Sequence, residues 1–370
     1  MLHRKQFALW TSISMLGVAL LAAGCGPAAT PVPQQAAQAG AAKNQLHVGG
    51  FYVDEQGPYN SYYSLQKYAG QLDELFPFWY SIQPDGSIQG NRNDKVVSLA
   101  RKNHIRVAPM FNVAKAKDTF LHNQQTRQKA AANIASIVKK NGYDGALVDA
   151  QFIPGNAGEE DFRHIANELT DFMRTTRNAL GSGKELDAAV LPHVQVPAEM
   201  SGVYQYKPLA GIVDRMTLMA YDQHSESSTA GPVAPFDWVE SSIQQMIKEG
   251  VPPSKIYLGV ASYGYNWHDD QSGGFSQPTE EILKQARQRG ADVRWDAQHK
   301  EPYYIYYGPS GTERKVYFES SSTLKQKVAL AQKYKLYGIA LWRMGFEDPS
   351  FWSAIKQTVP KAGNQPTSGR

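Results

Sequence analysis

The 370-residue sequence has a single cysteine, Cys25, so no disulfide can form within the chain. It also lacks an excess of one charge: 38 Lys and Arg stand against 34 Asp and Glu, a net charge of +4. No run of Lys and Arg with interleaved aromatic residues occurs, which argues against nucleic acid as a partner. The nine His show no HxH or HxxxH spacing beside acidic residues, and no Gly-rich phosphate loop follows the first predicted strand. The sequence therefore predicts no metal and no cofactor.

Long hydrophobic runs are absent except near the N-terminus. The basic start His3–Lys5 precedes the apolar run Phe7–Leu21, which is short for a membrane span and typical of a signal peptide. The run ends in LAAGC (Leu21–Cys25), which resembles the lipobox of bacterial lipoproteins. We therefore expect residues 1–24 to be a lipoprotein signal peptide and Cys25 to carry lipid, so that the protein is exported and held at the cell membrane, facing the cell wall. The alternative is an ordinary secretory signal with an incidental cysteine.

Composition separates the two ends of the remaining chain from its centre. Residues 25–44 are Ala, Pro, Gln and Gly with almost no charge, which predicts a flexible tether. Residues 359–370 are expected to be a disordered tail. Residues 45–358 are long enough for one large α/β domain.

Strand-like runs alternate with helical patterns along residues 45–358, which indicates a parallel sheet. Eight such units predict a closed (β/α)₈ TIM barrel. A small α+β insertion is expected at residues 267–316, with a helix over 279–288 and short strands over 293–295 and 303–307. The predicted barrel strands are 47–53, 75–82, 105–112, 143–151, 186–193, 215–221, 256–263 and 338–343, and the predicted helices 95–103, 124–141, 159–180, 238–249 and 322–334.

The stretch YDGALVDAQ, Tyr143–Gln151, forms the fourth predicted strand and carries the most informative polar residues. Alternate side chains of a strand share a face, so Leu147, Asp149 and Gln151 point the same way. The C-terminal end of a barrel strand is where barrel enzymes place their chemistry. An Asp that binds loop amides beside a space-filling Gln is the structural alternative.

This stretch resembles the D-x-x-D-x-D-x-E signature of glycoside hydrolase family 18, and most closely its bacterial branch directed at spore cortex and peptidoglycan. Asp144, Gly145 and Asp149 match. Leu147 replaces an Asp or Asn of the family, and Gln151 stands where the family has its catalytic Glu. Further segments support the resemblance in the right order: PFWYSIQPDG (77–86), MAYDQH (219–224), GPVAPFDWVE (231–240), PPSKIYLGVASYGYNW (252–267), VYFESSSTLKQK (316–327) and GIALWRMGFEDPSFW (338–352).

The resemblance implies substrate-assisted cleavage beside N-acetylglucosamine, in which the sugar's acetamide attacks its own anomeric carbon. It implies that Asp149 orients the acetamide, that Tyr221 forms a hydrogen bond with the acetamide oxygen, and that Trp342 forms the floor of the sugar site. It also places Asp144, Asp222 and Arg343 among the substrate-binding residues. Aromatic residues of the first two strands, among them Phe51 and Phe78, either line the cleft or fill the barrel.

Gln151 cannot supply the general acid that this mechanism needs, because an amide has no proton acidic enough for general acid catalysis. Glu159, Glu160 or Asp222 could supply a substitute acid. The expectation is a tethered barrel that binds glycan containing N-acetylglucosamine, peptidoglycan or a chitin-like polymer, with impaired turnover. The alternatives are an active glycosidase that uses another acid, and a protein-interaction module on a degenerate barrel.

Overall fold

The computed structural model describes residues 45–113, 119–151, 159–268, 273–359 and 361. The predicted signal peptide, Cys25, the tether and most of the predicted tail therefore lie outside the described residues. By its internal contacts the chain divides between Ala42 and Lys43, and the fold below is that of the second unit. Within the described residues, no helix combines the length and the apolar composition needed to cross a membrane.

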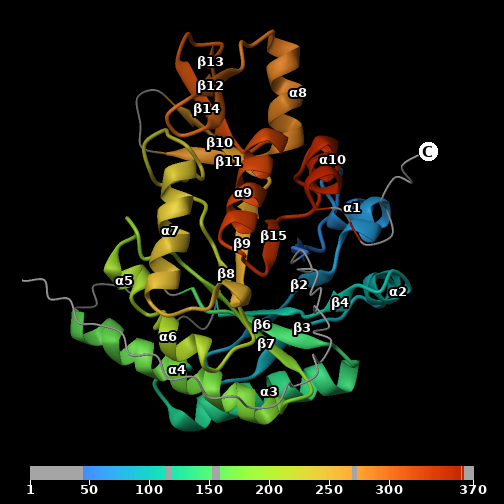
Figure 1. The fold of residues 1–370 in the computed structure, drawn as a ribbon, viewed down its shortest axis with the longest axis vertical. Coiled ribbons are helices and arrows are strands. Elements are labelled where there is room, and N and C mark those ends of the chain that lie inside the picture. The colour runs from blue at the N-terminus through green and yellow to red at the C-terminus, as the bar shows by residue number, and fades with distance from the viewer. Residues whose placement is uncertain (1–44, 114–118, 152–158, 269–272, 360, 362–370) are drawn as a thin grey trace, which may run out of the picture. The chain divides into compact units, whose positions relative to one another are not determined.

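Parallel strands close into a (β/α)₈ barrel, which confirms the predicted fold class (Figure 1). The direct pairing of β1 with β2 closes the sheet. The third predicted strand is split in two, because Pro109, which lacks an N–H donor, lies in the gap. The barrel strands are β1 (His47–Tyr52), β2 (Glu74–Ile82), β4 (Arg106–Val107) with β5 (Met110–Asn112), β6 (Gly145–Asp149), β7 (Glu185–Val190), β8 (Arg215–Leu218), β9 (Ile256–Ala261) and β15 (Gly338–Trp342), and β3 (Ile88–Gly90) adds antiparallel to β2.

The predicted helices lie between the strands with bounds within two residues of the expectation. Local signals explain their ends: Asn123 caps the start of α3 through its side chain, and Gly142 ends it at a φ of 63°. Helices α1, α5, α6 and α10 were not predicted, although Asn60 and Asp348 cap α1 and α10. The helices are α1 (Ser61–Tyr68), α2 (Asp94–Lys102), α3 (Gln124–Asn141), α4 (Glu159–Leu180), α5 (Ala198–Ser201), α6 (Tyr206–Ala210), α7 (Phe236–Lys248), α9 (Ser321–Lys333) and α10 (Pro349–Thr358), with 3₁₀ turns at Ala69–Gln71 and Pro253–Lys255.

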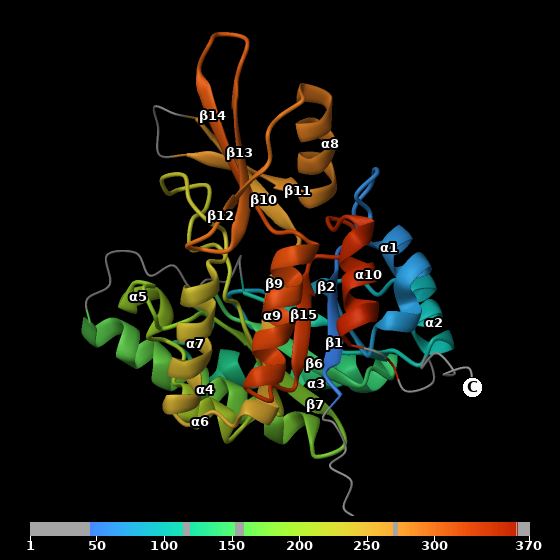
Figure 2. The ribbon, with the colours of Figure 1, turned by 45° about the horizontal axis from the view of Figure 1, so that its top comes forward.

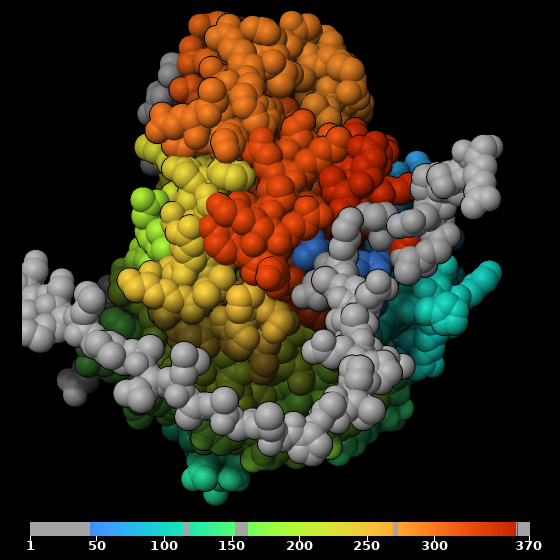
Figure 3. Space-filling model, in the orientation of Figure 1, coloured from blue at the N-terminus to red at the C-terminus, as the bar shows by residue number. Residues whose placement is uncertain are grey.

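The insertion is larger than predicted. Strand β9 ends just before Ser262, whose N–H donates to the carbonyl of Trp342, the last residue of β15, and whose hydroxyl donates to the carbonyl of Arg343. Tyr263 already belongs to a second sheet. This sheet has the order β11-β10-β14-β13-β12 and is antiparallel, and Figure 2 shows α8 beside it. Figure 3 shows the insertion, in orange, against the surface of α9 and α10, in red. Its elements are β10 (Tyr263–His268), β11 (Gly274–Pro278), α8 (Thr279–Arg289), β12 (Arg294–Asp296), β13 (Glu301–Tyr307) and β14 (Glu313–Phe318).

Layers of side chains fill the barrel interior and set the height of the site. The apolar layer includes Phe76, Met110, Leu147 and Tyr257, all buried. Because strand residues two apart share a face, Asp149 lies one layer above Leu147, at the C-terminal end of β6. The interior below Asp149 is thus packed, and the open space lies above it.

Candidate functional site

Two cavities meet at the C-terminal ends of the barrel strands. Asp149, Gln151 and Trp342 line both of them. The first cavity has a volume of about 380 Å³, and Met219, Tyr221, Asp222 and Trp238 are among its other lining residues. The second, of about 400 Å³, is lined in addition by Val53, Glu55, Phe78, Asn112 and Arg343. A chain-like ligand that occupies both cavities must pass Asp149, Gln151 and Trp342.

Asp149 and Gln151 are in direct contact at this junction. The side-chain amide of Gln151 donates hydrogen bonds to both carboxylate oxygens of Asp149, at 3.0 and 3.2 Å, and lies 3.5 Å from the Met219 sulfur. Asp149 is 7% exposed, and burial raises its pKa to about 6, while the hydrogen bond from Gln151 acts in the opposite direction. At neutral pH Asp149 is therefore mainly ionised and Gln151 is held as its donor.

Tyr221 and Asp222 follow β8 and enter the first cavity from the side opposite β2. Gly259 on β9 leaves room for the Tyr221 ring, since a Cβ there would lie 2.9 Å from the ring carbon Cε1. Burial, followed by the charges of Asp222 and Asp149, raises the pKa of Tyr221 well above its ordinary value. Tyr221 thus keeps its proton and serves as a hydrogen-bond donor.

Asp222 is held by the insertion. Its Oδ1 accepts hydrogen bonds from the hydroxyls of Tyr263, at 2.6 Å, and Tyr265, at 2.9 Å, and its backbone lies in the left-handed region with φ of 64°. Asp222 lines the first cavity, and desolvation by the surrounding protein raises the pKa of its carboxyl, while the hydrogen bonds from the two tyrosine hydroxyls act in the opposite direction. The insertion therefore positions one wall of the first cavity.

Trp342 ends β15 and is half-buried between the two cavities. Phe51 and Phe78 contact it edge-on, with ring centroids 5.2 and 6.2 Å away. Both phenylalanines also line a cavity, so these two members of the aromatic set face the site, whereas Tyr80 is buried in the core. A flat, partly exposed indole held by two rings suits stacking on a sugar ring.

Arg343 lines the second cavity, but its guanidinium is engaged by protein groups. It pairs with Glu55, lies 3.4 Å from the Ser61 hydroxyl, and covers the Phe346 ring at 3.6 Å. Glu55 is a carboxylate that lines the second cavity and was not anticipated from the sequence. It forms an ion pair with Arg343.

The structure does not bring Asp144 to the site. Asp144 precedes β6, at the opposite end of the strand from Asp149, and its carboxylate accepts the Val107 N–H at 2.8 Å. Its position supports a role in pairing β4 with the β6 segment rather than the expected role in substrate binding. Leu147, which departs from the signature as Gln151 does, is fully buried in the barrel interior.

Sequence reasoning missed several lining residues, chiefly Asn112 and the methionines. Asn112 ends β5 and is paired in register with Asp149, so the rule that strand ends carry function could have found it. Met110 and Met200 gave no signal, since methionine also occurs in cores, and Met219 was noted only as part of the segment MAYDQH. The side chains of Glu159 and Glu160, proposed as substitute acids, lie outside the described residues, although both residues begin α4.

Two groups of side chains among the described residues have the donor types and spacing of a metal site. Glu74, Glu185 and Asp187 lie at the opposite end of the barrel, where Arg106 and Arg215 form ion pairs with Glu185. These arginines already compensate the acidic charge there. The second group, His122, His164 and Glu168, lies between α3 and α4. His122 and His164 are 42 positions apart in the chain, so no spacing motif in the sequence revealed the group.

Comparison with known proteins agrees with this geometry. A sequence model of the glycosyl hydrolases family 18 matches residues 50–347. The chain is 26% identical over 298 residues to YdhD of Bacillus subtilis (strain 168), whose name describes it as a sporulation-specific glycosylase, covering 76% of this chain and 67% of YdhD. It is 24% identical to the cortical fragment-lytic enzyme of Bacillus anthracis, over 79% of this chain and 70% of that enzyme. The crystal structure of the Bacillus cereus spore cortex-lytic enzyme SleL shares the fold, with a TM-score of 0.75 at 18% identity, over 85% of this chain and 74% of SleL.

Proposed function

The chain belongs to glycosyl hydrolase family 18, and from this premise we propose that it binds glycan containing N-acetylglucosamine, with turnover limited by Gln151. The observation that carries the proposal is the junction of the two cavities, where Asp149, Gln151 and Trp342 meet. Asp149, Tyr221 and Asp222 supply acceptors and a donor for an acetamide, and Trp342 offers a stacking surface. The similarity to the cortical fragment-lytic enzyme favours peptidoglycan over chitin as the polymer.

Limited turnover follows from the chemistry of the Gln151 amide. Departure of a sugar alcohol needs a proton, and a positioned general acid contributes about 10²- to 10⁴-fold to such a step. The amide can still donate a hydrogen bond to the glycosidic oxygen, so it retains a binding role. In the absence of ligand its donors face Asp149.

A second candidate function, an active glycosidase, rests on Asp149 itself. With a pKa raised to about 6, this carboxyl is partly protonated under mildly acidic conditions. It then carries the one titratable proton at the junction, but a protonated Asp149 stabilises the developing positive charge less well. Cleavage that uses Asp149 as the acid should become faster as the pH falls towards 6, whereas a protein that only binds glycan shows no cleavage at any pH.

We further propose that Cys25 is lipidated and tethers the exported barrel to the membrane through residues 25–44. The support is the sequence LAAGC after the apolar run Phe7–Leu21. Several acyl chains anchor a protein firmly where one chain binds only marginally. The tether would place the barrel next to the cell wall.

One experiment tests the function directly. The purified chain is incubated with peptidoglycan fragments and with N-acetylglucosamine oligomers, and binding is measured by calorimetry while products are followed by mass spectrometry, at pH 5, 6 and 7. Binding without cleavage is the expected result. Cleavage that increases towards pH 6 and below supports the Asp149 alternative. Absence of both binding and cleavage contradicts the proposal and favours a protein-interaction module.

A further inference from the structure

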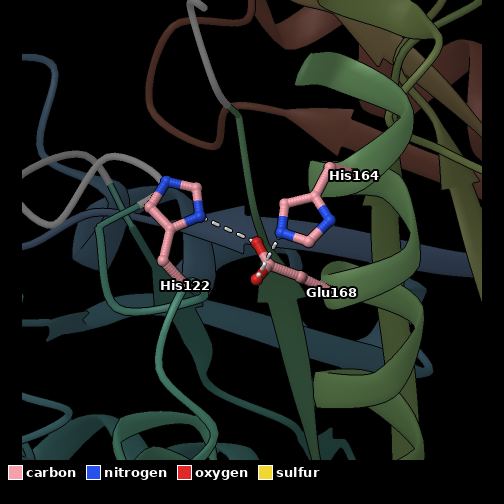
Figure 4. A group of neighbouring side chains, drawn as sticks. All are labelled: His122, His164 and Glu168. Atoms are coloured by element: carbon pink, nitrogen blue, oxygen red, sulfur yellow. Dashed lines mark hydrogen bonds and ion pairs between the residues drawn. The ribbon is translucent and has the colours of Figure 1, made fainter. Parts of the chain in front are cut away.

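His122, His164 and Glu168 form a compact group on the flank of the barrel, shown in Figure 4. His122 lies just before α3, in the segment that follows β5, and His164 and Glu168 lie one turn apart on α4. The i, i+4 spacing places the two α4 side chains on one helix face. The group therefore joins two chain segments that follow neighbouring barrel strands.

The donor atoms are already close to the separation that a metal ion requires. Nδ1 of His122 lies 2.8 Å from Oε2 of Glu168, and Nε2 of His164 lies 3.2 Å from Oε1. All three donor atoms lie within 4.8 Å of one another. A tetrahedral zinc with bonds of about 2.0–2.2 Å holds its ligand atoms about 3.3–3.6 Å apart, so shifts of about 1 Å or less at the exposed imidazoles would complete the geometry.

Exposure and charge also suit a cation. The carboxylate is largely buried, with a side-chain exposure of 9%, while the imidazoles are 49% and 69% exposed. Nη1 of Arg127 lies 3.6 Å from Oε1 of Glu168, and Nε of Arg127 is paired with Asp171 at 3.0 Å. Two carboxylates, those of Glu168 and Asp171, thus share one fixed cation.

We propose that His122, His164 and Glu168 bind a divalent transition metal, Zn²⁺, with water in the remaining position. Two imidazoles and one carboxylate are a ligand set of zinc rather than of calcium or magnesium, which take oxygen ligands. The metal ties the segment before α3 to α4. This inference is independent of the glycan function, because none of its ligands lines either cavity.

The test uses zinc alone as the probe. The chain from residue 25 onwards is prepared without a polyhistidine tag, with Cys25→Ser so that no thiol competes, and is freed of metal with a chelator. Calorimetric titration with Zn²⁺ should show one bound ion per chain. Thermal unfolding should show a higher Tm with Zn²⁺, whereas Ca²⁺ should leave the Tm unchanged. Absence of stoichiometric zinc binding in this protein overturns the proposal whatever the variants do.

Variants assign the site. His122→Ala, His164→Ala and the near-isosteric Glu168→Gln should each weaken zinc affinity at least about 10-fold, since even outer-shell changes cost about 10–100-fold. His268→Ala removes another exposed histidine, at the end of β10, and should bind zinc like the parent. Circular dichroism of the metal-free proteins verifies the fold. A single zinc site that survives in folded His122→Ala and His164→Ala lies elsewhere and refutes the assignment.

Discussion

Replacing Gln151 by Glu tests the proposed reason for limited turnover. The substitution keeps the size and shape of the side chain and changes one amide into a carboxyl. In the parent, the Gln151 amide donates to Asp149 at 3.0 and 3.2 Å, so the new carboxyl should lie equally close to Asp149. We expect the variant to cleave N-acetylglucosamine oligomers at least about 10²-fold faster than the parent, the lower end of general acid catalysis.

The magnitude depends on whether the new carboxyl keeps a proton at neutral pH. Two carboxylates about 3 Å apart repel by about 5.5 kcal/mol at an effective dielectric constant of about 20, equivalent to about 4 pKa units. The pKa of Asp149 is already raised to about 6 even though Asp149 accepts hydrogen bonds from the Gln151 amide, and the substitution removes these hydrogen bonds. The pair should therefore share one proton through neutral pH, and the proton belongs to the pair rather than to either residue.

The assay compares leaving groups. Cleavage of a sugar leaving group needs the acid, whereas departure of an activated phenol needs little help, so Gln151→Glu should accelerate oligomer cleavage much more than cleavage of an aryl glycoside. Gln151→Met, similar in length but without an acidic proton, is the matched control and should gain no activity. If Gln151→Glu binds oligomers as the parent does yet cleaves them no faster, the missing acid is not what limits turnover.

If Gln151→Glu folds but stays inactive, a second substitution at Leu147 tests whether Asp149 lacks a supporting partner. The resemblance to the family implies an Asp or Asn where Leu147 stands, so Leu147→Asn added to Gln151→Glu should steady Asp149. Leu147 is fully buried in the apolar layer of the barrel, and an amide there costs about 1–3 kcal/mol of folding free energy if it finds no partner. A double variant that binds sugar and stays inert would mean that the cleft geometry has diverged from catalysis.

Two further predictions rest on the geometry of the site, and a third rests on the sequence LAAGC. Trp342→Ala should weaken oligosaccharide affinity by about 1–3 kcal/mol in calorimetry, the scale of aromatic burial and stacking, and unchanged affinity in a folded variant would favour the interaction module. The folded-state pKa of Asp149 is raised from 3.8 to about 6, so its protonated form stabilises the fold below about pH 4 and this contribution is lost as the pH rises to 6. Asp149→Asn should then raise the free energy of unfolding by up to about 3 kcal/mol at pH 7 but hardly at pH 4, and urea denaturation that shows no such pH dependence contradicts the assigned burial cost. Cys25→Ser should leave the protein soluble or unprocessed on membrane fractionation, and a membrane-bound variant of mature size would exclude the lipobox interpretation.

The sequence by itself determined the barrel and the key pair of the site. Alternating strand and helix patterns are set by local periodicity, so all eight barrel strands and the long helices could be predicted within a few residues. Residues two apart on a strand share a face whatever the fold around them, which is why Asp149 and Gln151 could be expected side by side. The resemblance to glycoside hydrolase family 18 assigned Tyr221 and Trp342 to the site, and the predicted bounds of their strands placed both near C-terminal strand ends.

Only the tertiary structure decided which of the remaining residues reach the site. Asp144 shares the signature with Asp149 but lies at the other end of β6, because each residue of a strand advances about 3.3 Å. In the insertion, β12 and β13 were predicted, whereas β10, β11 and β14 escaped prediction, since antiparallel pairing between distant segments, such as β10 with β14, leaves little local pattern. Glu55 and Arg343 meet across almost the whole chain, and His122 meets Glu168 across 46 positions. Contacts of this kind depend on how the closed barrel and the packed helices place side chains in space, and residue spacing within the sequence does not reveal this.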